Sequence, residues 1–135
     1  MKLTKNFSLV EFLESVFYDD DQQELVYKSF DQDSKLQLNV IELAQNLQAL
    51  RDKVSAPISI NIAYRPKWYE LLMGRSGNSK HTLGMAADIK VKGMRPKEVN
   101  AIIDNLIKEG KMKQGGLGLY KTFNHYDIRG TKARW

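Results

Sequence analysis

The stretch "SKHTLGMAADI", residues 79–89, holds one of only two histidines in a chain of 135 residues. Its second half, read on as "GMAADIKVK" (84–92), is typical of a β-strand, in which Ala86 and Asp88 share one face. His81 lies in the loop just before this predicted strand. A loop that curls over the sheet brings His81 to the face that carries Asp88.

Three flanking segments supply a second strand and two helices. In "APISINIAYRP" (56–66), isoleucine recurs at every second position, which predicts a half-buried strand. In "LQLNVIELAQNLQALRDKV" (36–54), apolar residues recur at spacings of three and four, which predicts the clearest helix of the chain. "RPKEVNAIIDNLIKEG" (95–110) predicts another helix, with Pro96 near its start and Gly110 after its end.

The N-terminal part adds a further helix and a polar break. "FSLVEFLESVF" (7–17) predicts a helix that begins with a capping box between Ser8 and Glu11 and places Val16 on its apolar face. "YDDDQQ" (18–23) carries three aspartates without the spacing of a calcium-binding loop, so it is predicted to be a charged helix end or a loop.

The remaining segments complete the predicted fold. "KWYELLMG" (67–74) predicts a short helix, and "GGLGLY" (115–120) and "NHYDIRG" (124–130) predict two closing strands. The sequence contains no repeat and no linker. It therefore predicts one domain over residues 1–135 of the α+β class, in which helices pack on one face of a small, largely antiparallel sheet.

Composition excludes several classes of protein and site. The chain has no cysteine, which rules out disulfides and thiolate metal sites, so any zinc must be held by histidine and carboxylate. The net charge of +5 comes from scattered basic residues, a pattern that favours a solvated surface over a nucleic-acid interface. No apolar run is long enough to span a bilayer. The start, "MKLTKNFSLVEF", lacks the apolar core of a signal peptide, so we expect synthesis and folding in the cytoplasm.

The second histidine also has an aspartate nearby. His125 and Asp127 are two residues apart, so on a strand they project to the same face. Two histidines and two aspartates then meet above one sheet. Zinc is commonly held by imidazole and carboxylate with one position open, and a further acid beside such a site can accept a proton. Spacing alone leaves open the alternative that both histidines are structural or lie at the surface.

A family resemblance adds to this interpretation. "SKHTLGMAAD" (79–88) matches the Ser-x-His-x-x-Gly-x-Ala-x-Asp motif of zinc D-Ala-D-Ala carboxypeptidases and related murein peptidases. "GGLGLYKTFNHYDIRGTKARW" (115–135) resembles the closing segment of the subgroup found in phages and bacterial cell-wall enzymes. The similarity covers nearly the whole chain. It implies the Hedgehog/DD-peptidase fold and a Zn2+-dependent peptidase.

The resemblance assigns roles to individual residues. His81, Asp88 and His125 match the zinc ligands. Ser79 matches the motif serine beside the substrate, and Arg65 matches an arginine that binds the substrate carboxylate or a backbone carbonyl. A guanidinium suits both tasks, and the alternative for Arg65 is a surface ion pair.

One position departs from the family pattern. Several members of the superfamily carry the catalytic acid three residues before the last ligand, where this chain has Thr122. We therefore expect Asp127 to be the base, or to orient water or His125. In some relatives the second residue of the closing pair is the ligand; Asp127 would then bind zinc and His125 would be the acid/base.

These expectations lead to two functional hypotheses. The first is a zinc metallopeptidase that hydrolyses stem peptides or cross-bridges of peptidoglycan, as a carboxypeptidase or an endopeptidase. It would be a monomer without a nucleic-acid partner, released or delivered to the cell wall like a phage lysin. The second is a catalytically inactive murein-binding or virion structural module of the same fold, which Thr122 supports.

Overall fold

The computed structural model describes residues 1–135 and contains five α-helices and one five-stranded sheet. The helices are α1 (Val10–Leu13), α2 (Asp20–Asp31), α3 (Ser34–Val54), α4 (Lys67–Leu72) and α5 (Pro96–Lys108), and a 3-10 turn, η1, spans Lys80–Leu83. The strands are β1 (Ile58–Ile62), β2 (Ala86–Val91), β3 (Gly116–Leu119), β4 (Asn124–Asp127) and β5 (Ala133–Arg134). The strand order is β1-β2-β4-β3-β5, and only the β3–β5 pair is parallel.

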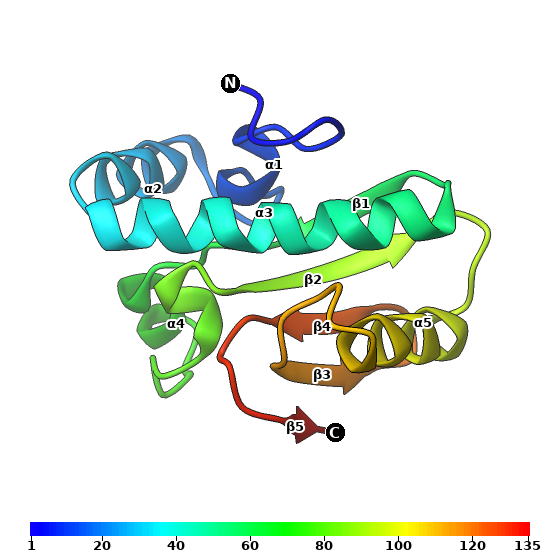
Figure 1. Cartoon of the computed structure of the whole chain (residues 1–135). Coiled ribbons are helices and arrows are strands. Elements are labelled where there is room, and N and C mark those ends of the chain that lie inside the picture. The colour runs from blue at the N-terminus through cyan, green and yellow to red at the C-terminus, as the bar shows by residue number, and fades with distance from the viewer.

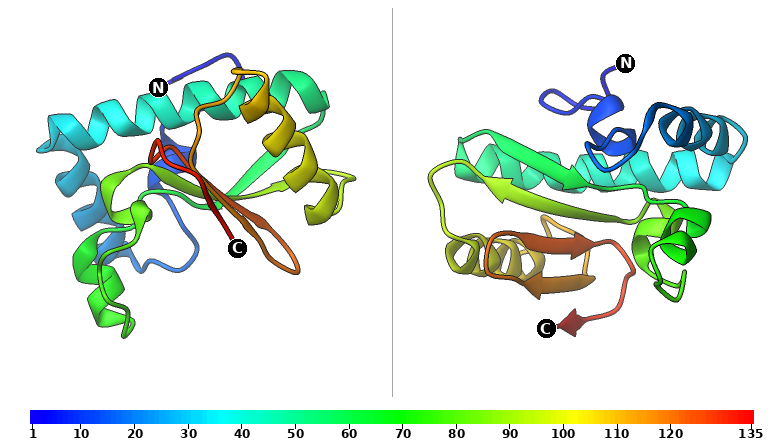
Figure 2. Two further views of the ribbon diagram at one scale, coloured as in Figure 1. Left: turned by 60° about the horizontal axis from the view of Figure 1, so that its bottom comes forward. Right: turned by 180° about the vertical axis from the view of Figure 1, so that it is seen from behind.

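The two long helices α3 and α5 lie on the same face of the sheet, and the view from behind shows β2, β4 and β3 without a helix in front of them (Figures 1 and 2). One cluster of 25 buried residues fills the space between helices and sheet. The predicted α+β class, with a mostly antiparallel sheet, is confirmed. No helix combines the length and the apolar character that a membrane crossing requires.

Helix α3 forms the centre of the hydrophobic core. The Asp33 side chain caps it by accepting a 3.0 Å hydrogen bond from the backbone N–H of Leu36. Its inward residues recur at helical spacing and are all buried: Leu36, Val40, Leu43, Ala44, Leu47 and Leu50. Helix α5 begins with Pro96 at its first turn, as the sequence predicts, and buries Val99, Ile103, Leu106 and Ile107.

Leu47→Ala tests how much this core contributes to stability. Leu47 is fully buried in the middle of α3, so the substitution removes apolar contacts and leaves a cavity. We expect the free energy of unfolding to fall by about 2–5 kcal/mol. Urea denaturation followed by circular dichroism measures the change. The control, Leu38→Ala on the exposed side of the same helix, should cost less than about 1 kcal/mol.

The helix predicted over residues 7–17 is wrong in its extent. Only α1 is helical, and Glu14 already has an extended backbone. Glu11 accepts a 2.7 Å hydrogen bond from the backbone N–H of Ser8, but the Ser8 side chain makes no cap, so half of the expected capping box forms. The side chain of Gln23 donates to the carbonyl of Leu13 at 2.9 Å and satisfies the end of this short helix. Val16, expected on the apolar face, is 95% exposed.

The aspartate-rich segment 18–23 is a helix start. Asp19 is the N-cap of α2 and forms a capping box with Gln22. Asp20 and Asp21 lie in the first turn, where carboxylates interact favourably with the helix dipole. The sequence predicts a charged helix end or a loop here but does not predict the twelve-residue helix that follows.

Two local features place the residues around His81. The register of β1 shifts between Ile60 and Ile62, and the residue paired with Ile62 is Asp88. Such irregularities re-aim side chains. On the other side, Gly84 ends η1 with φ +71°, and a Cβ there would lie 2.5 Å from Leu36 Cδ1. The sequence interpretation of Gly84 as a packing constraint agrees with this close approach to α3.

Candidate metal centre

The centre lies where β2 and β4 pair in the middle of the sheet. Asp88 and His125 are direct cross-strand partners, so their side chains project from the same face. The core side of the same strands is occupied by Ala87, Ile89 and Tyr126. His81 reaches the pair from η1, which precedes β2. This is the convergence that the alternation of residues predicts.

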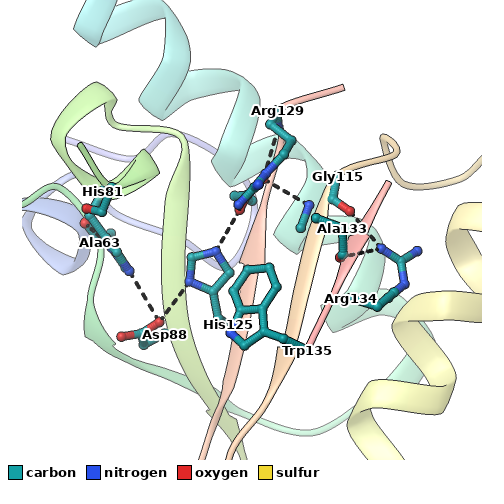
Figure 3. Close-up of polar contacts among 12 residues, drawn as sticks. Ala63, His81, Asp88, Gly115, His125, Arg129, Ala133, Arg134 and Trp135 are labelled. Atoms are coloured by element: carbon teal, nitrogen blue, oxygen red, sulfur yellow. Dashed lines mark hydrogen bonds and ion pairs between the residues drawn. The ribbon is translucent and has the colours of Figure 1, made fainter. Parts of the chain in front are cut away.

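The three side chains meet at one oxygen atom. Asp88 Oδ1 lies 3.3 Å from His81 Nε2 and 3.3 Å from His125 Nδ1 (Figure 3). One ligand atom from each residue lies within 4.8 Å of the others. Both histidines are buried, whereas the Asp88 side chain is partly accessible. The arrangement can hold a metal ion from the solvent side.

In each imidazole, the ring nitrogen that points away from Asp88 makes a hydrogen bond. This bond decides on which ring nitrogen the lone pair of the neutral imidazole lies. His81 Nδ1 lies 2.8 Å from the carbonyl oxygen of Ala63, to which it can only donate. His125 Nε2 lies 2.7 Å from Asp127 Oδ2. In the neutral imidazoles, His81 Nε2 and His125 Nδ1 are therefore left as acceptors toward the centre, the tautomers that metal ligation requires. In the protonated imidazoles the same two nitrogens donate to Asp88. Two imidazoles and one carboxylate with one side open suit zinc.

The charges of the centre favour a deprotonated Asp88. Burial by itself raises the pKa of this carboxyl, but the hydrogen bonds and charges of His125 and His81 outweigh burial and hold the pKa well below its usual range. Burial lowers the pKa of His125, but Asp127 and Asp88 reverse the effect and raise it. A bound metal must then displace a proton from His125 at low pH, so affinity should fall as the solution is acidified.

Asp127 is held on the far side of His125 from the centre. It is fully buried, and Arg129 donates to it from Nε at 2.9 Å and from Nη2 at 2.7 Å. The backbone N–H groups of Gly116 and Arg129 donate as well. Burial raises the pKa of Asp127, but these bonds and the bond from His125 outweigh burial and hold it well below its usual range.

This geometry favours the orienting role among the three roles considered for Asp127. A general base needs a carboxylate with a moderate pKa within reach of the substrate, and Asp127 does not line the cleft. A metal ligand would have to face the centre, whereas Asp127 binds the opposite nitrogen of His125. A Cβ on Gly116 would lie 2.2 Å from Asp127 Oδ2, so this carboxylate fits only beside a glycine.

Asp127→Asn tests the orienting role. Loss of the negative charge weakens the bond that fixes the His125 ring, so we expect metal affinity to fall about 10- to 100-fold. Competition with a chromophoric chelator measures the affinity. Asp104→Asn is the matched control, because Asp104 pairs with Arg134 and Lys108 and with no candidate ligand, so the change should leave affinity unchanged. Equal affinity in the Asp127→Asn and wild-type proteins would contradict the role.

Arg65 and Ser79, both predicted beside the substrate, come together at the cleft. Arg65 Nε donates to Glu70 Oε2 at 2.8 Å, and Ser79 Oγ donates to the same oxygen. The Arg65 side chain is 11% exposed and Glu70 only 1%, so the ion pair is buried and is not the surface pair considered as the alternative. The backbone N–H of Arg65 also donates to the carbonyl of His81, which couples the end of β1 to η1.

A cleft of about 560 Å³ opens above the centre. Its wall carries Arg65, Arg75, Lys80 and Arg129 as cations, and Asp88 is its only carboxylate. A neighbouring hollow of about 310 Å³ shares Arg65, Arg75 and Asp88 with it and is lined mainly by apolar groups such as Tyr69 and Met73. The cleft and this hollow thus place both positive charge and apolar surface next to the centre.

The aromatic part of the wall was not predicted. The Trp135 ring lies 4.9 Å from the His125 ring (Figure 3). Trp135 Nε1 donates to the Tyr120 hydroxyl at 2.7 Å. Arg129 lies over the same indole at 5.5 Å. Alternation along the chain was a usable signal for Arg129, because it follows His125 and Asp127 at intervals of two. Trp135 lies in the closing segment that resembles the family, but the resemblance assigns no role to it.

Comparison with known proteins agrees with a metal centre at these residues. The model of the Peptidase M15 family matches residues 20–127, a region that runs from α2 to the end of β4 and includes all three candidate ligands. None of the curated proteins compared with the chain matches it significantly. The family is one of zinc-dependent metallopeptidases, in agreement with the donor set. Because the match covers most of the sequence, the chain belongs to the Peptidase M15 family.

Proposed function

We propose that the protein is a zinc metallopeptidase that hydrolyses peptide bonds in the stem peptides or cross-bridges of bacterial peptidoglycan. The observation that carries the proposal is the convergence of His81, Asp88 and His125 at the floor of an open cleft. Zinc held by such a set acts as a Lewis acid toward a carbonyl oxygen and activates water.

The residues of the cleft suit a peptide that carries carboxylates. The two terminal amino groups of Arg65 make no hydrogen bond within the protein and are not buried without a partner, so they are free to bind a carboxylate or a carbonyl oxygen. Arg75, Lys80 and Arg129 add positive charge to the same wall. Stem peptides of murein carry such carboxylates, and the net charge of +5 favours approach to an anionic wall.

The proposal extends to where and how the protein acts. We propose a monomer that works on the wall after release or delivery from the cytoplasm, as a phage lysin does, and that binds no nucleic acid. It acts as a carboxypeptidase or as an endopeptidase, and the fragments that it releases distinguish the two activities.

A second function is favoured by one observation. Asp88 is the only carboxylate of the cleft, Thr122 occupies the position where several relatives carry an acid, and Asp127 is turned away from the cleft. A protein with this arrangement and no turnover would be a murein-binding or virion structural module of the same fold.

Digestion of purified peptidoglycan separates the two functions. The zinc-loaded protein should release peptide fragments or amino acids detectable by mass spectrometry, and a chelator should stop the release until zinc is restored. Asp88→Asn should release nothing, because the centre loses its only carboxylate ligand. If the wild-type protein sediments with peptidoglycan but releases no fragment, the binding function replaces the enzymatic one.

A further inference from the structure

Glu70 lies behind the wall of the cleft at the meeting point of three chain segments. It belongs to α4, while Arg65 follows β1 and Ser79 precedes η1. We call Arg65, Glu70 and Ser79 the Glu70 cluster. Arg65 Nε and Ser79 Oγ both donate to Glu70 Oε2, and the backbone carbonyl of Glu70 accepts from the N–H of Arg75 at 2.8 Å. Arg65, Ser79 and Arg75 all line the cleft, whereas Glu70 does not.

A buried carboxylate at this position costs free energy, and packing of the fold alone does not require a charged residue here. Glu70 is 1% exposed, and burial of a charge is unfavourable unless the charge is paired and hydrogen-bonded. An apolar residue of the same size would fill the space at a lower cost. The specific property of Glu70 is that one of its oxygens binds two residues that face the cleft.

The bond to Nε decides which edge of the guanidinium is available. Glu70 occupies Nε, so the two terminal amino groups of Arg65 remain as a pair on the opposite edge. This pair can donate two parallel hydrogen bonds to a carboxylate, or two to a carbonyl oxygen. Without the anchor, Arg65 is a long side chain with many rotamers, and ordering it on binding costs free energy.

We propose that Glu70 is a positioning residue that aims Arg65, and with it Ser79, at the oxygen atoms of the bound peptide. The inference rests on the proposed function for the identity of the ligand, but the geometry of the Glu70 cluster does not depend on that function. Glu70 does not line the cleft, so it cannot itself act as a general base toward the substrate.

The variants are chosen to separate positioning from folding. Glu70→Gln keeps the shape and one acceptor oxygen but removes the charge. Glu24→Gln is the matched control, since Glu24 forms an exposed ion pair with Lys28 on α2. Neither change touches a candidate ligand, so zinc content should equal that of the wild type in both. Thermal unfolding of each variant verifies that it is folded.

The first readout requires no peptidase activity. The Nε–H resonance of Arg65 in a ¹⁵N spectrum, identified by its loss in Arg65→Lys, should exchange slowly with water because it is bound to a buried carboxylate. In Glu70→Gln this resonance should shift and exchange faster, while Glu24→Gln should leave it unchanged. An identical resonance in Glu70→Gln and wild type would overturn the proposal, whether or not the wild type cleaves murein.

The second readout is a double-mutant cycle on a murein stem peptide. Misplacing a substrate-binding group by about 1 Å costs on the order of 10²-fold, so Glu70→Gln should lower kcat/KM by roughly 10- to 100-fold. In an Arg65→Ala background the same change should lose most of its effect, because its main target is gone and only the bond to Ser79 remains. Equal losses in both backgrounds would mean that Glu70 serves only the fold and would refute the proposal. An inactive wild type would count against the proposed function and leave the resonance test to decide on Glu70.

Discussion

His81→Ala protein should fold, bind almost no zinc and release no fragments from peptidoglycan. The substitution removes one of three ligands and leaves Asp88 and His125, a pair with too few donors for a stable site. His81 is not part of the cluster of 25 buried residues, so the fold keeps its core. Elemental analysis of the purified protein measures the zinc content, and Lys90→Ala, an exposed position on β2, is the control.

Thermal unfolding gives an independent measure of the same prediction. A metal that binds only the folded state stabilises it by about 2.7 kcal/mol when free metal exceeds the dissociation constant 100-fold. A chelator should therefore lower the Tm of the wild type by on the order of 10 °C. It should have no effect on His81→Ala. Full zinc content in His81→Ala would rule out the assignment of the ligands.

Arg65→Ala should keep its zinc and lose most of its activity. The Arg65 side chain contacts Glu70 but no candidate ligand, and its free amino groups face the cleft. Loss of a preorganised donor to a developing oxyanion or a carboxylate costs about 2–4 kcal/mol, a fall in kcat/KM of roughly 30- to 1000-fold. Steady-state kinetics on a stem peptide measures this fall. Arg51→Ala, at the end of α3, should have wild-type kinetics.

The same variant should also be less stable, since Glu70 is left buried without its cation. Breaking a buried ion pair from one side costs about 3–5 kcal/mol. Arg65→Ala/Glu70→Gln should recover much of this stability and none of the activity. Unchanged turnover in Arg65→Ala would show that the guanidinium serves the fold alone.

The parts of the molecule that the sequence predicts are those with a regular pattern. Periodic apolar residues identify α3 and α5, and alternation identifies β1 and β2. The alternation also places Asp88 on the face away from the core and His125 beside Asp127 on one face. The residue pattern thus groups two histidines and two aspartates, and the family resemblance selects three of them, His81, Asp88 and His125, as the candidate ligands. Such a pattern involves only residues close in sequence, and the geometry of a helix or strand then determines which face of the element each side chain occupies.

The parts that the sequence does not predict depend on contacts between distant segments. Nothing local shows that Glu70 is buried, because its partners Arg65 and Ser79 come from other segments. Strand β5 has only two residues and exists because β3 offers it an edge. Helix α1 stops early because tertiary hydrogen bonds, such as that from Tyr64 N–H to the carbonyl of Phe12, compete with helical ones. The sequence predicts that Asp127 lies beside His125, but it does not predict that Arg129 covers and buries Asp127.

The pairing of Asp88 with His125 has a consequence for the order of events during synthesis. Strand β2 leaves the ribosome well before β4, and α5 and β3 lie between them in the chain. A nascent chain that ends before β4 has only His81 and Asp88 to offer, so it has no competent centre. A slip of one residue between β2 and β4 would turn His125 to the opposite face of the sheet. A metal ion could therefore bind at the proposed centre only after a newly made chain has completed its central strand pair in the correct alignment.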